Sequence, residues 1–151
     1  MSAYTIALAT PADIADYVQE PGAVTSDSDK LAAALQEGKF SALIARSGDE
    51  AVALATFYST YSTWTTVTGL NLDDLFVEPA HRAAGLGKRM LGRLGQLAQE
   101  RGCERIEWMV HLWNDSAIAF YEQRLGAKPL NDLKREKLEG KEAISRLAAL
   151  A

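Results

Sequence analysis

The segment NLDDLFVEPAHRAAGLGKRML, residues 71–91, decides the fold that we expect for this chain. A short apolar strand ends at Val77, Pro79 breaks it, and a loop with Gly85 and Gly87 leads into an amphipathic helix. The glycines leave no side chains where the first helical turn begins. Its N–H groups can therefore point at an anion, which the helix dipole also favours. Three basic residues flank the turn: Arg82, Lys88 and Arg89. The segment predicts a phosphate-binding site.

Two nucleotide-binding motifs are excluded by the same residues. A P-loop, GxxxxGK[ST], would need glycine where Arg82 stands and a hydroxyl residue where Arg89 follows Gly87-Lys88. A Rossmann fingerprint would need its third glycine at Met90. The remaining alternative is a basic helix start after an ordinary glycine-containing loop.

Length and composition favour one globular domain, residues 1–151. The chain has 151 residues, of which 48% are hydrophobic and 24% charged, which is enough for one core. It shows no apolar run long enough to span a membrane and no signal-peptide pattern, and its one cysteine, Cys103, allows no internal disulfide. We therefore expect a cytoplasmic protein. The net charge of −4 argues against nucleic acid as the main partner.

The pattern of apolar residues and turn signals predicts a mixed α/β sheet. The expected strands are 4–9, 40–46, 51–61, 70–77, 104–110 and, more weakly, 134–139. The first expected helix is short, opened by Thr10-Pro11 with Asp13 as its capping acid. The other expected helices are 27–37, one from the glycine loop to about residue 101, one from Asn114 or Asp115 to Leu125, and 140–150. Residues 62–69 are expected to connect two strands. The sheet should be antiparallel at first and parallel around 70–110.

The helix after the glycine loop carries one apolar stripe at helical spacing. Its members are Leu86, Met90, Leu94, Leu97 and Ala98. We expect this stripe to pack on the sheet.

Two motifs resemble the signatures of the GNAT superfamily of N-acyltransferases. R-x-x-G-x-G at 82–87 resembles the acyl-CoA pyrophosphate loop, and WNDSAIAFYEQRLGA at 113–127 is similar to the second signature, an asparagine followed by a helix ending in F-Y-x-x-x-G. The resemblance implies a GNAT-like acyl-CoA N-acyltransferase fold, with a central mixed, mostly antiparallel sheet flanked by helices. It implies acetyl-CoA as co-substrate and no metal. The residues that it assigns to the pyrophosphate are Arg82, Ala83, Ala84, Gly85, Leu86, Gly87 and Lys88.

A narrower resemblance is to the diamine N-acetyltransferases, which include spermidine/spermine and thialysine acetyltransferases. It rests on FYSTYSTW (57–64), LDDLFV (72–77) and HLWNDSAIAFY (111–121). It implies a homodimer that transfers acetyl directly to a primary amine of a small molecule: a diamine, a polyamine or a lysine analogue.

Acetyl transfer to an amine requires removal of the amine proton. At a pKa near 10.4, only about one lysine-like amine in a thousand is free base at neutral pH. An acidic site can bind the ammonium and accept its proton through water. Asp73 is our candidate for that base or amine binder, and Asp74 for a second acidic contact. In the family the position of Asp73 is typically glutamate. Strand alternation would put the two aspartates on opposite faces unless the strand bulges. The alternative to a functional role is that both are solvated charges at a strand end.

The departing thiolate needs a proton, and Tyr121 is the candidate acid. A phenol with a pKa near 10 is protonated at neutral pH and can donate to a thiolate with a pKa near 8.5. From spacing alone, Tyr121 reads as a core aromatic; the F-Y match to the family favours the acid.

The family resemblance also implies contacts with the pantetheine arm. Asn114 is expected to meet this arm as well as to cap its helix. Phe76 and Val77 are expected to offer backbone hydrogen bonds that extend the sheet.

Two aromatic residues, Tyr61 and Trp64, match the family's Y-x-x-W and are candidates for lining a cation's path through their ring faces. The alternative is a loop anchored by burying Trp64. His111 is a weaker candidate for a base.

Other acceptors stay open: an amino acid, an aminoglycoside or a protein amine. The stretch LNDLKREKLEG (130–140) has three basic residues and no tryptophan, which weakens the polyamine interpretation. A non-catalytic acyl-CoA sensor is the alternative outside the enzymes.

Overall fold

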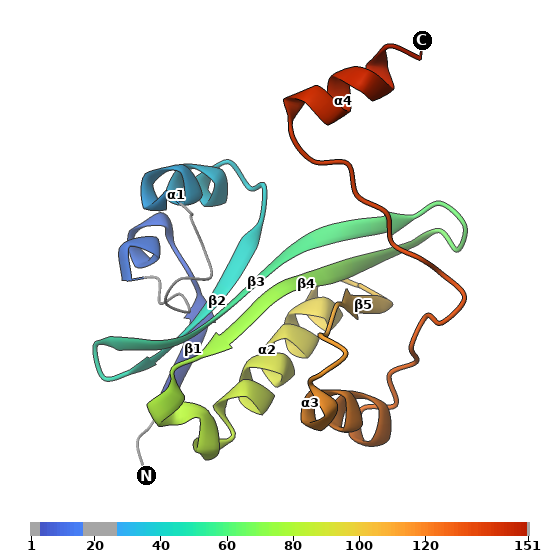
Figure 1. The fold of residues 1–151 in the computed structure, drawn as a ribbon. Coiled ribbons are helices and arrows are strands. Elements are labelled where there is room, and N and C mark those ends of the chain that lie inside the picture. The colour runs from blue at the N-terminus through green and yellow to red at the C-terminus, as the bar shows by residue number, and fades with distance from the viewer. Residues whose placement is uncertain (1–3, 17–26, 151) are drawn as a thin grey trace. The chain divides into compact units, whose positions relative to one another are not determined.

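The computed structural model describes residues 4–16 and 27–150 (Figure 1). The chain divides into two compact units, Met1–Met109 and Val110–Ala151. The expectation of a single domain stays a prediction. Within the described part of the chain, no helix combines the length and apolar character that crossing a bilayer requires.

The first unit is built on a five-stranded sheet whose spatial order follows the sequence. Its strands are β1 (Tyr4–Leu8), β2 (Ser41–Ser47), β3 (Glu50–Ser62), β4 (Val67–Val77) and β5 (Arg105–Trp108). The first four pair antiparallel, whereas β5 runs parallel to β4. The predicted mixed sheet, with its parallel part around residues 70–110, is confirmed.

Helix α2 (Leu86–Glu100) packs along one face of this sheet (Figure 1). The buried residues of α2 are Leu86, Met90, Leu94, Leu97 and Ala98, which is the predicted stripe. They form the main core with inward residues of β2, β3 and β4, including Leu43, Ala55, Phe57, Leu70 and Leu72. A smaller cluster on the opposite face joins Ala42, Ile44 and Leu54. Because α2 covers only one face of the sheet, the opposite face of β3 and β4 is not covered by this helix and can carry polar side chains.

The other helical elements of this unit are short: η1 (Pro11–Asp16), α1 (Ser28–Gln36) and η2 (Pro79–Ala84). The expected start of η1 is confirmed, because Thr10 N–H and Thr10 Oγ1 donate to Asp13 Oδ2 over 2.6 and 2.7 Å. Arg46 bonds Asp13 Oδ1 at 2.8 Å. The two Thr10 hydrogen bonds, and then Arg46, lower the pKa of Asp13 to about 2. This network fixes η1 to β2.

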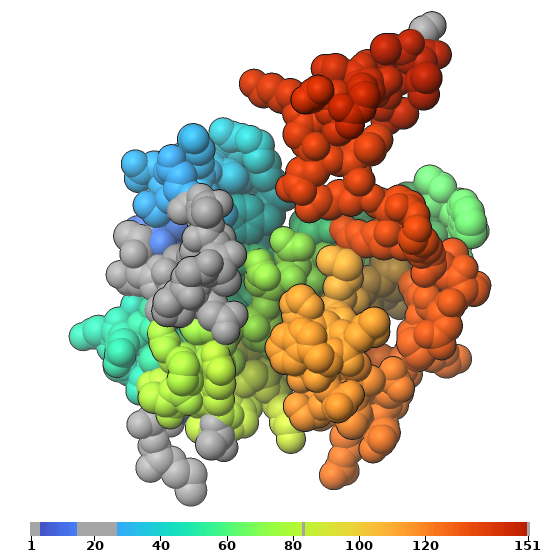
Figure 2. Space-filling view, in the orientation of Figure 1, coloured from blue at the N-terminus to red at the C-terminus, as the bar shows by residue number. Residues whose placement is uncertain are grey.

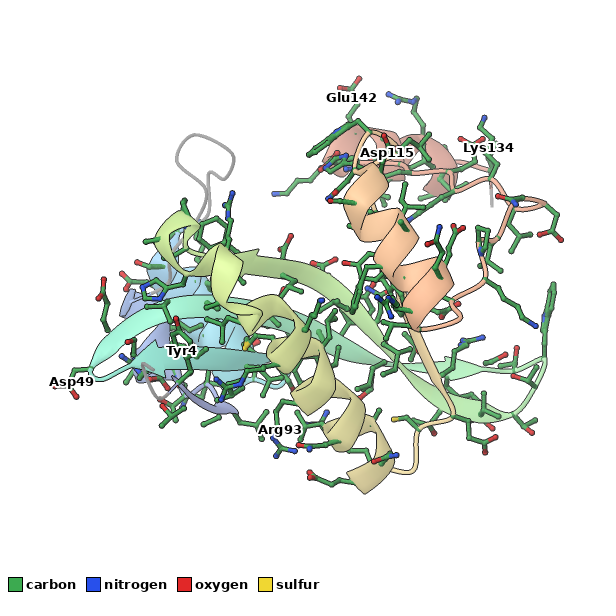
Figure 3. All side chains as sticks on the ribbon, turned by 90° about the horizontal axis from the view of Figure 1, so that it is seen from below. Tyr4, Asp49, Arg93, Asp115, Lys134 and Glu142 are labelled. Carbon is green, nitrogen blue, oxygen red and sulfur yellow. The ribbon has the colours of Figure 1, made fainter. Side chains whose placement is uncertain are left out.

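The β3–β4 hairpin is longer than the sequence suggested. Ser62 still pairs with Val67, so the turn occupies only 63–66, not 62–69. Serine, threonine and valine suit extended backbone, and their polar side chains hid the strand ends. Gly69 is required in β4, because a Cβ there would lie 2.9 Å from Thr60 Oγ1 and 3.0 Å from the Arg105 carbonyl. The green tip of the hairpin reaches the surface in Figure 2. The β2–β3 turn, marked by Asp49 in Figure 3, lies at the other end of the sheet.

The second unit contains α3 (Asp115–Ala119), η3 (Phe120–Arg124) and α4 (Lys141–Ala148). The helix expected from residue 115 to 125 is present, but its second half is a π-helix, in which Leu125 N–H donates to the Phe120 carbonyl at 3.3 Å. The weak strand expected at 134–139 is wrong. That stretch, labelled at Lys134 in Figure 3, is irregular and exposed, and its side chains form the ion pairs Lys134–Glu136 and Lys137–Glu139. It lacks the alternating apolar residues that a strand needs to bury a face.

Candidate functional site

The predicted phosphate-binding turn lies between η2 and α2. Gly85 has φ +71°, in the left-handed region, and is the N-cap of α2. The first helical hydrogen bond runs from Arg89 N–H to the Gly85 carbonyl, so the amides of Leu86 and Gly87 precede it and point out of the helix end. Gly87 adds no side chain above them. The turn thus offers backbone donors and a positive dipole end to an anion.

Arg82 is held against the end of β4. Its Nε donates to the Val77 carbonyl at 2.8 Å, and its guanidinium lies 5.6 Å from the centre of the Phe76 ring. The positive charge is therefore fixed at the point where the strand passes into the turn. Ala83 and Ala84 lie in η2 between this arginine and Gly85.

A second set of contacts ties the turn to the start of β1, where Figure 3 labels Tyr4. Tyr4 Oη and His81 Nδ1 are 2.9 Å apart, and their rings meet edge to face. Arg89 donates to the Tyr4 carbonyl at 3.1 Å. These bonds hold η2 and the first turn of α2 to the sheet from outside the loop. The sequence did not predict them, because 77 residues separate Tyr4 from His81.

The edge of β4 that leads to this turn has no strand beside it in the described part of the chain. β5 pairs with β4 only from Gly69 to Leu72, whereas β4 continues to Val77. Backbone groups alternate in direction along a strand, and Glu78 N–H donates to the Val52 carbonyl of β3. The backbone groups of Phe76 therefore face Leu54 of β3, whereas those of Val77 face the open edge, where an extended ligand arm can add as a strand does. The Val77 carbonyl already accepts from Arg82, so one of its two acceptor positions is occupied.

The acidic pair lies at a β-bulge. Thr56 of β3 faces Asp74, and the next residue, Phe57, faces Leu72, so Asp73 is an extra residue in β4. Leu70 and Leu72 before the bulge pack in the core beneath α2, and so do Leu75 and Val77 after it. The alternation has therefore shifted by one residue, and it places Asp73 and Asp74 on the same face, opposite α2.

Burial, and secondarily the neighbouring charge of Asp73, raises the pKa of Asp74. Both aspartates remain partly accessible to solvent. The pair therefore combines an accessible negative charge with one carboxylate of increased proton affinity.

Residues of β3 extend this acidic face, and sequence reasoning missed two of them. Alternation puts Thr56 and Tyr58 on the same face as the acidic pair, and Asn71 lies opposite Tyr58. We call Thr56, Tyr58, Asn71, Asp73 and Asp74 the polar strip. The signal was present in the sequence: apolar residues at 70 and 72, followed by 75 and 77, change phase at the two aspartates.

The structure does not bring Tyr61 and Trp64 to the polar strip. Tyr61 is five residues along β3 from Thr56, or roughly 17 Å at the rise of a strand. Alternation turns Tyr61 to the α2 face, and it is 62% exposed. Trp64 is 95% exposed, so it does not anchor the turn by burial. Their role in guiding a cation stays a prediction.

The remaining candidates belong to the second unit. Tyr121 lies in the π-helix η3, and burial raises the pKa of its phenol, which keeps it protonated. Asn114 caps α3 as predicted, with Oδ1 accepting from Ala117 N–H at 3.3 Å. His111 stacks on Trp113 with ring centres 5.1 Å apart. The pantetheine contact of Asn114 stays a prediction. In the described residues, no three potential metal ligands gather in one place.

Comparison with known proteins agrees with this geometry. Residues 9–127 match the Acetyltransferase (GNAT) family. The chain belongs to the GNAT family. It is an acyltransferase, and members of this family use acetyl-CoA as co-substrate.

Relatives of this acetyltransferase include enzymes named for thialysine and for ornithine. Thialysine N-epsilon-acetyltransferase of Caenorhabditis elegans is 32% identical over 110 residues, which are 73% of this chain and 68% of that protein. L-ornithine N5-acetyltransferase of Arabidopsis thaliana is 33% identical over 84 residues, which are 56% of this chain but only 36% of that protein. An integron cassette protein of V. cholerae shares the fold, with a TM-score of 0.77, 20% identity and coverage of 98% of both chains.

The first prediction for this acetyltransferase concerns Gly87. A Cβ at this position would meet only Val77 Cγ2, at 3.8 Å, so Gly87→Ala should fold and be as stable as the native chain or more so. The added methyl group would block the approach of a phosphate to the helix end. We expect coenzyme A to bind about tenfold more weakly, the effect of losing one charge-assisted hydrogen bond, measured by titration calorimetry.

Gly92→Ala is the matched control, because Gly92 lies in the same helix and a Cβ there meets no atom within 4 Å. It should raise the thermal midpoint without changing the affinity for coenzyme A. Equal affinities in Gly87→Ala and Gly92→Ala would contradict the assignment of this turn.

The second prediction concerns the stability cost of Asp74. Its raised pKa means that the ionised form is disfavoured in the folded state relative to the unfolded chain. This cost is present at neutral pH and disappears as the pH falls below the ordinary aspartate range, where both states are protonated. Asp74→Asn should therefore raise the thermal midpoint at pH 7, and the gain should shrink toward pH 3.

Asp49→Asn, in the exposed β2–β3 turn, is the control and should shift stability by less than about 0.5 kcal/mol. Calorimetric scans across this pH range make the comparison. A midpoint for Asp74→Asn below that of the native chain at pH 7 would show that Asp74 stabilises the fold as an anion.

Proposed function

We propose that the protein transfers acetyl from acetyl-CoA to a primary amine of a small molecule that carries more than one charged group: a diamine, a polyamine or a lysine analogue. The observation that carries the proposal is the bulge at Asp73, which puts two carboxylates on one face of the strand that leads to the anion-binding turn. One strand thus joins the group that would attract an ammonium to the turn that would hold a diphosphate.

The coenzyme's diphosphate would bind at the amides of residues 85–88, with Arg82 supplying positive charge beside them. The pantetheine arm would run along the open edge of β4 and use the backbone N–H of Val77. This path directs the thioester toward Asp73 and Asp74, because they precede Phe76 on the same strand. Asn114 is proposed as a further contact of the arm.

In the proposed reaction, the free amine attacks the thioester carbonyl carbon. A nitrogen–carbon bond forms, the carbon–sulfur bond breaks, and the amine proton passes through water to a carboxylate. The sequence assigns this base to Asp73 and a second contact to Asp74. The raised pKa of Asp74 supports Asp74 as the carboxylate that more readily accepts the proton, with Asp73 as the anion that holds the ammonium.

The third prediction is the preference for dications. With acetyl-CoA as donor, diamines and lysine or ornithine analogues should exceed monoamines of equal length by roughly fivefold or more in kcat/KM, since one exposed ion pair contributes up to about 1 kcal/mol. They should also exceed aminoglycosides and peptides. Release of the coenzyme A thiol and the mass of the product give the two readouts.

Asp73→Asn and Asp74→Asn serve as matched variants in the same panel, because each removes one charge with little change of volume. Each should lose the preference for dications and lower kcat/KM. A native chain that binds coenzyme A but releases no thiol with any amine would favour the sensor over the enzyme, and a preference for aminoglycosides would overturn the substrate class.

The fourth prediction tests Tyr121, which we propose as the acid that protonates the departing thiolate. The proposal is supported by the F-Y match to the family and by burial, which raises the pKa of the phenol and keeps its proton available at neutral pH. Tyr121→Phe should keep the thermal midpoint and lower kcat by roughly two orders of magnitude, the usual worth of a positioned acid.

Phe120→Leu, at the preceding position of the same π-helix, is the control for packing. It should change stability more than kcat. Full kcat for Tyr121→Phe across the pH range would contradict the acid assignment.

A further inference from the structure

Thr56 is the one polar residue that is buried in the described part of the chain, at 7% exposure. Its neighbours along β3, Leu54, Ala55 and Phe57, are buried and apolar. A hydroxyl in such a place costs free energy unless it makes a hydrogen bond. Valine has the same shape without this cost, so packing alone does not explain a threonine here.

The hydroxyl makes its bond at the bulge. Thr56 Oγ1 accepts from the backbone N–H of Asp74 at 3.2 Å. Thr56 is also the residue that faces Asp74 across the strands, where the register shifts. The bond therefore joins β3 to the point in β4 at which the extra residue, Asp73, has been accommodated.

We infer that Thr56 is a positioning residue for the acidic pair: its hydroxyl fixes the amide of Asp74 and thereby holds both carboxylates on one face at the site of acetyl transfer. This inference rests on the proposed function for its effect on catalysis, but its structural part does not. Without the bond, the bulge is still required by the apolar residues on either side of it, since Leu72 and Leu75 must both reach the core. The fold is therefore retained, and the loss is in the fixed direction of Asp73 and Asp74.

The same strand offers a matched control. Thr60 is four residues along β3 on the same face, and its Oγ1 is buried with no hydrogen-bond partner in the described residues. Thr60→Val removes a hydroxyl from a comparable environment without removing a bond. The difference between the two positions isolates the bond to Asp74 from the general effect of a threonine-to-valine change.

The fifth prediction compares Thr56→Val, Thr56→Ala, Thr56→Ser and Thr60→Val. Hydrogen–deuterium exchange of the Asp74 amide should be about tenfold faster in Thr56→Val and Thr56→Ala, which lack the acceptor, and close to native in Thr56→Ser and Thr60→Val. For the amine substrate, kcat/KM should fall about tenfold in the first two variants and recover in Thr56→Ser. The KM for acetyl-CoA should not change in any variant.

Slow exchange of the Asp74 amide in both Thr56→Val and Thr56→Ala would overturn the inference. So would equal losses for amine and acetyl-CoA, which would indicate a general loosening of the sheet, or an equal loss in Thr60→Val. If the native chain acetylates no amine, the proposed function fails, and the exchange comparison alone still decides whether the Thr56 hydroxyl holds the Asp74 amide.

Discussion

One change of phase in a single strand places the acidic pair of this molecule. Because side chains alternate along a strand, a β4 without an extra residue could not bury Leu70, Leu72, Leu75 and Val77 on one face. The bulge at Asp73 solves this packing problem, and the solution leaves two adjacent aspartates on the other face. Core packing and the acidic site therefore have the same cause. If this sequence paired with β3 without the bulge, part of the core would be exposed and the two carboxylates would lie on opposite faces.

The sequence predicted most of the first unit because its signals there are local. Helix α2 follows from one apolar stripe and two glycines, and the parallel pair β4–β5 follows from the strand–helix–strand order. The sequence left undecided whether β4 contains a bulge, although the change in phase of the apolar residues around Asp73 indicates one. Contacts between distant segments, such as Tyr4 with His81, have no local signal and could not be predicted. The strand expected at 134–139 failed because its charged residues pair with one another in solvent rather than bury a face.

The sequence predicted local features around the candidate site better than the arrangement of its residues. The turn at 82–88, Asn114 as a helix cap and Tyr121 as a half-buried phenol lie where the sequence indicated. Tyr61 and Trp64 were chosen because large aromatics are unusual in a polar connection. The hairpin extends further than this connection implied, so Tyr61 lies near the far end of β3 and Trp64 in the turn beyond it, both away from the acidic pair. Tyr58, three residues before Tyr61, was passed over although strand alternation places it on the polar strip.

The departures from good packing in β3 and β4 are informative because they cluster. A buried hydroxyl at Thr56, an extra residue at Asp73 and a carboxylate of raised pKa at Asp74 meet at one register position, and each costs free energy when judged alone. Sequences generally keep such violations where function requires them. Thr60, whose hydroxyl has no partner among the described residues, shows that a single violation in this strand does not mark a site. It is the coincidence of three, joined by the bond from Asp74 N–H to Thr56 Oγ1, that distinguishes the bulge from a local imperfection in the sheet.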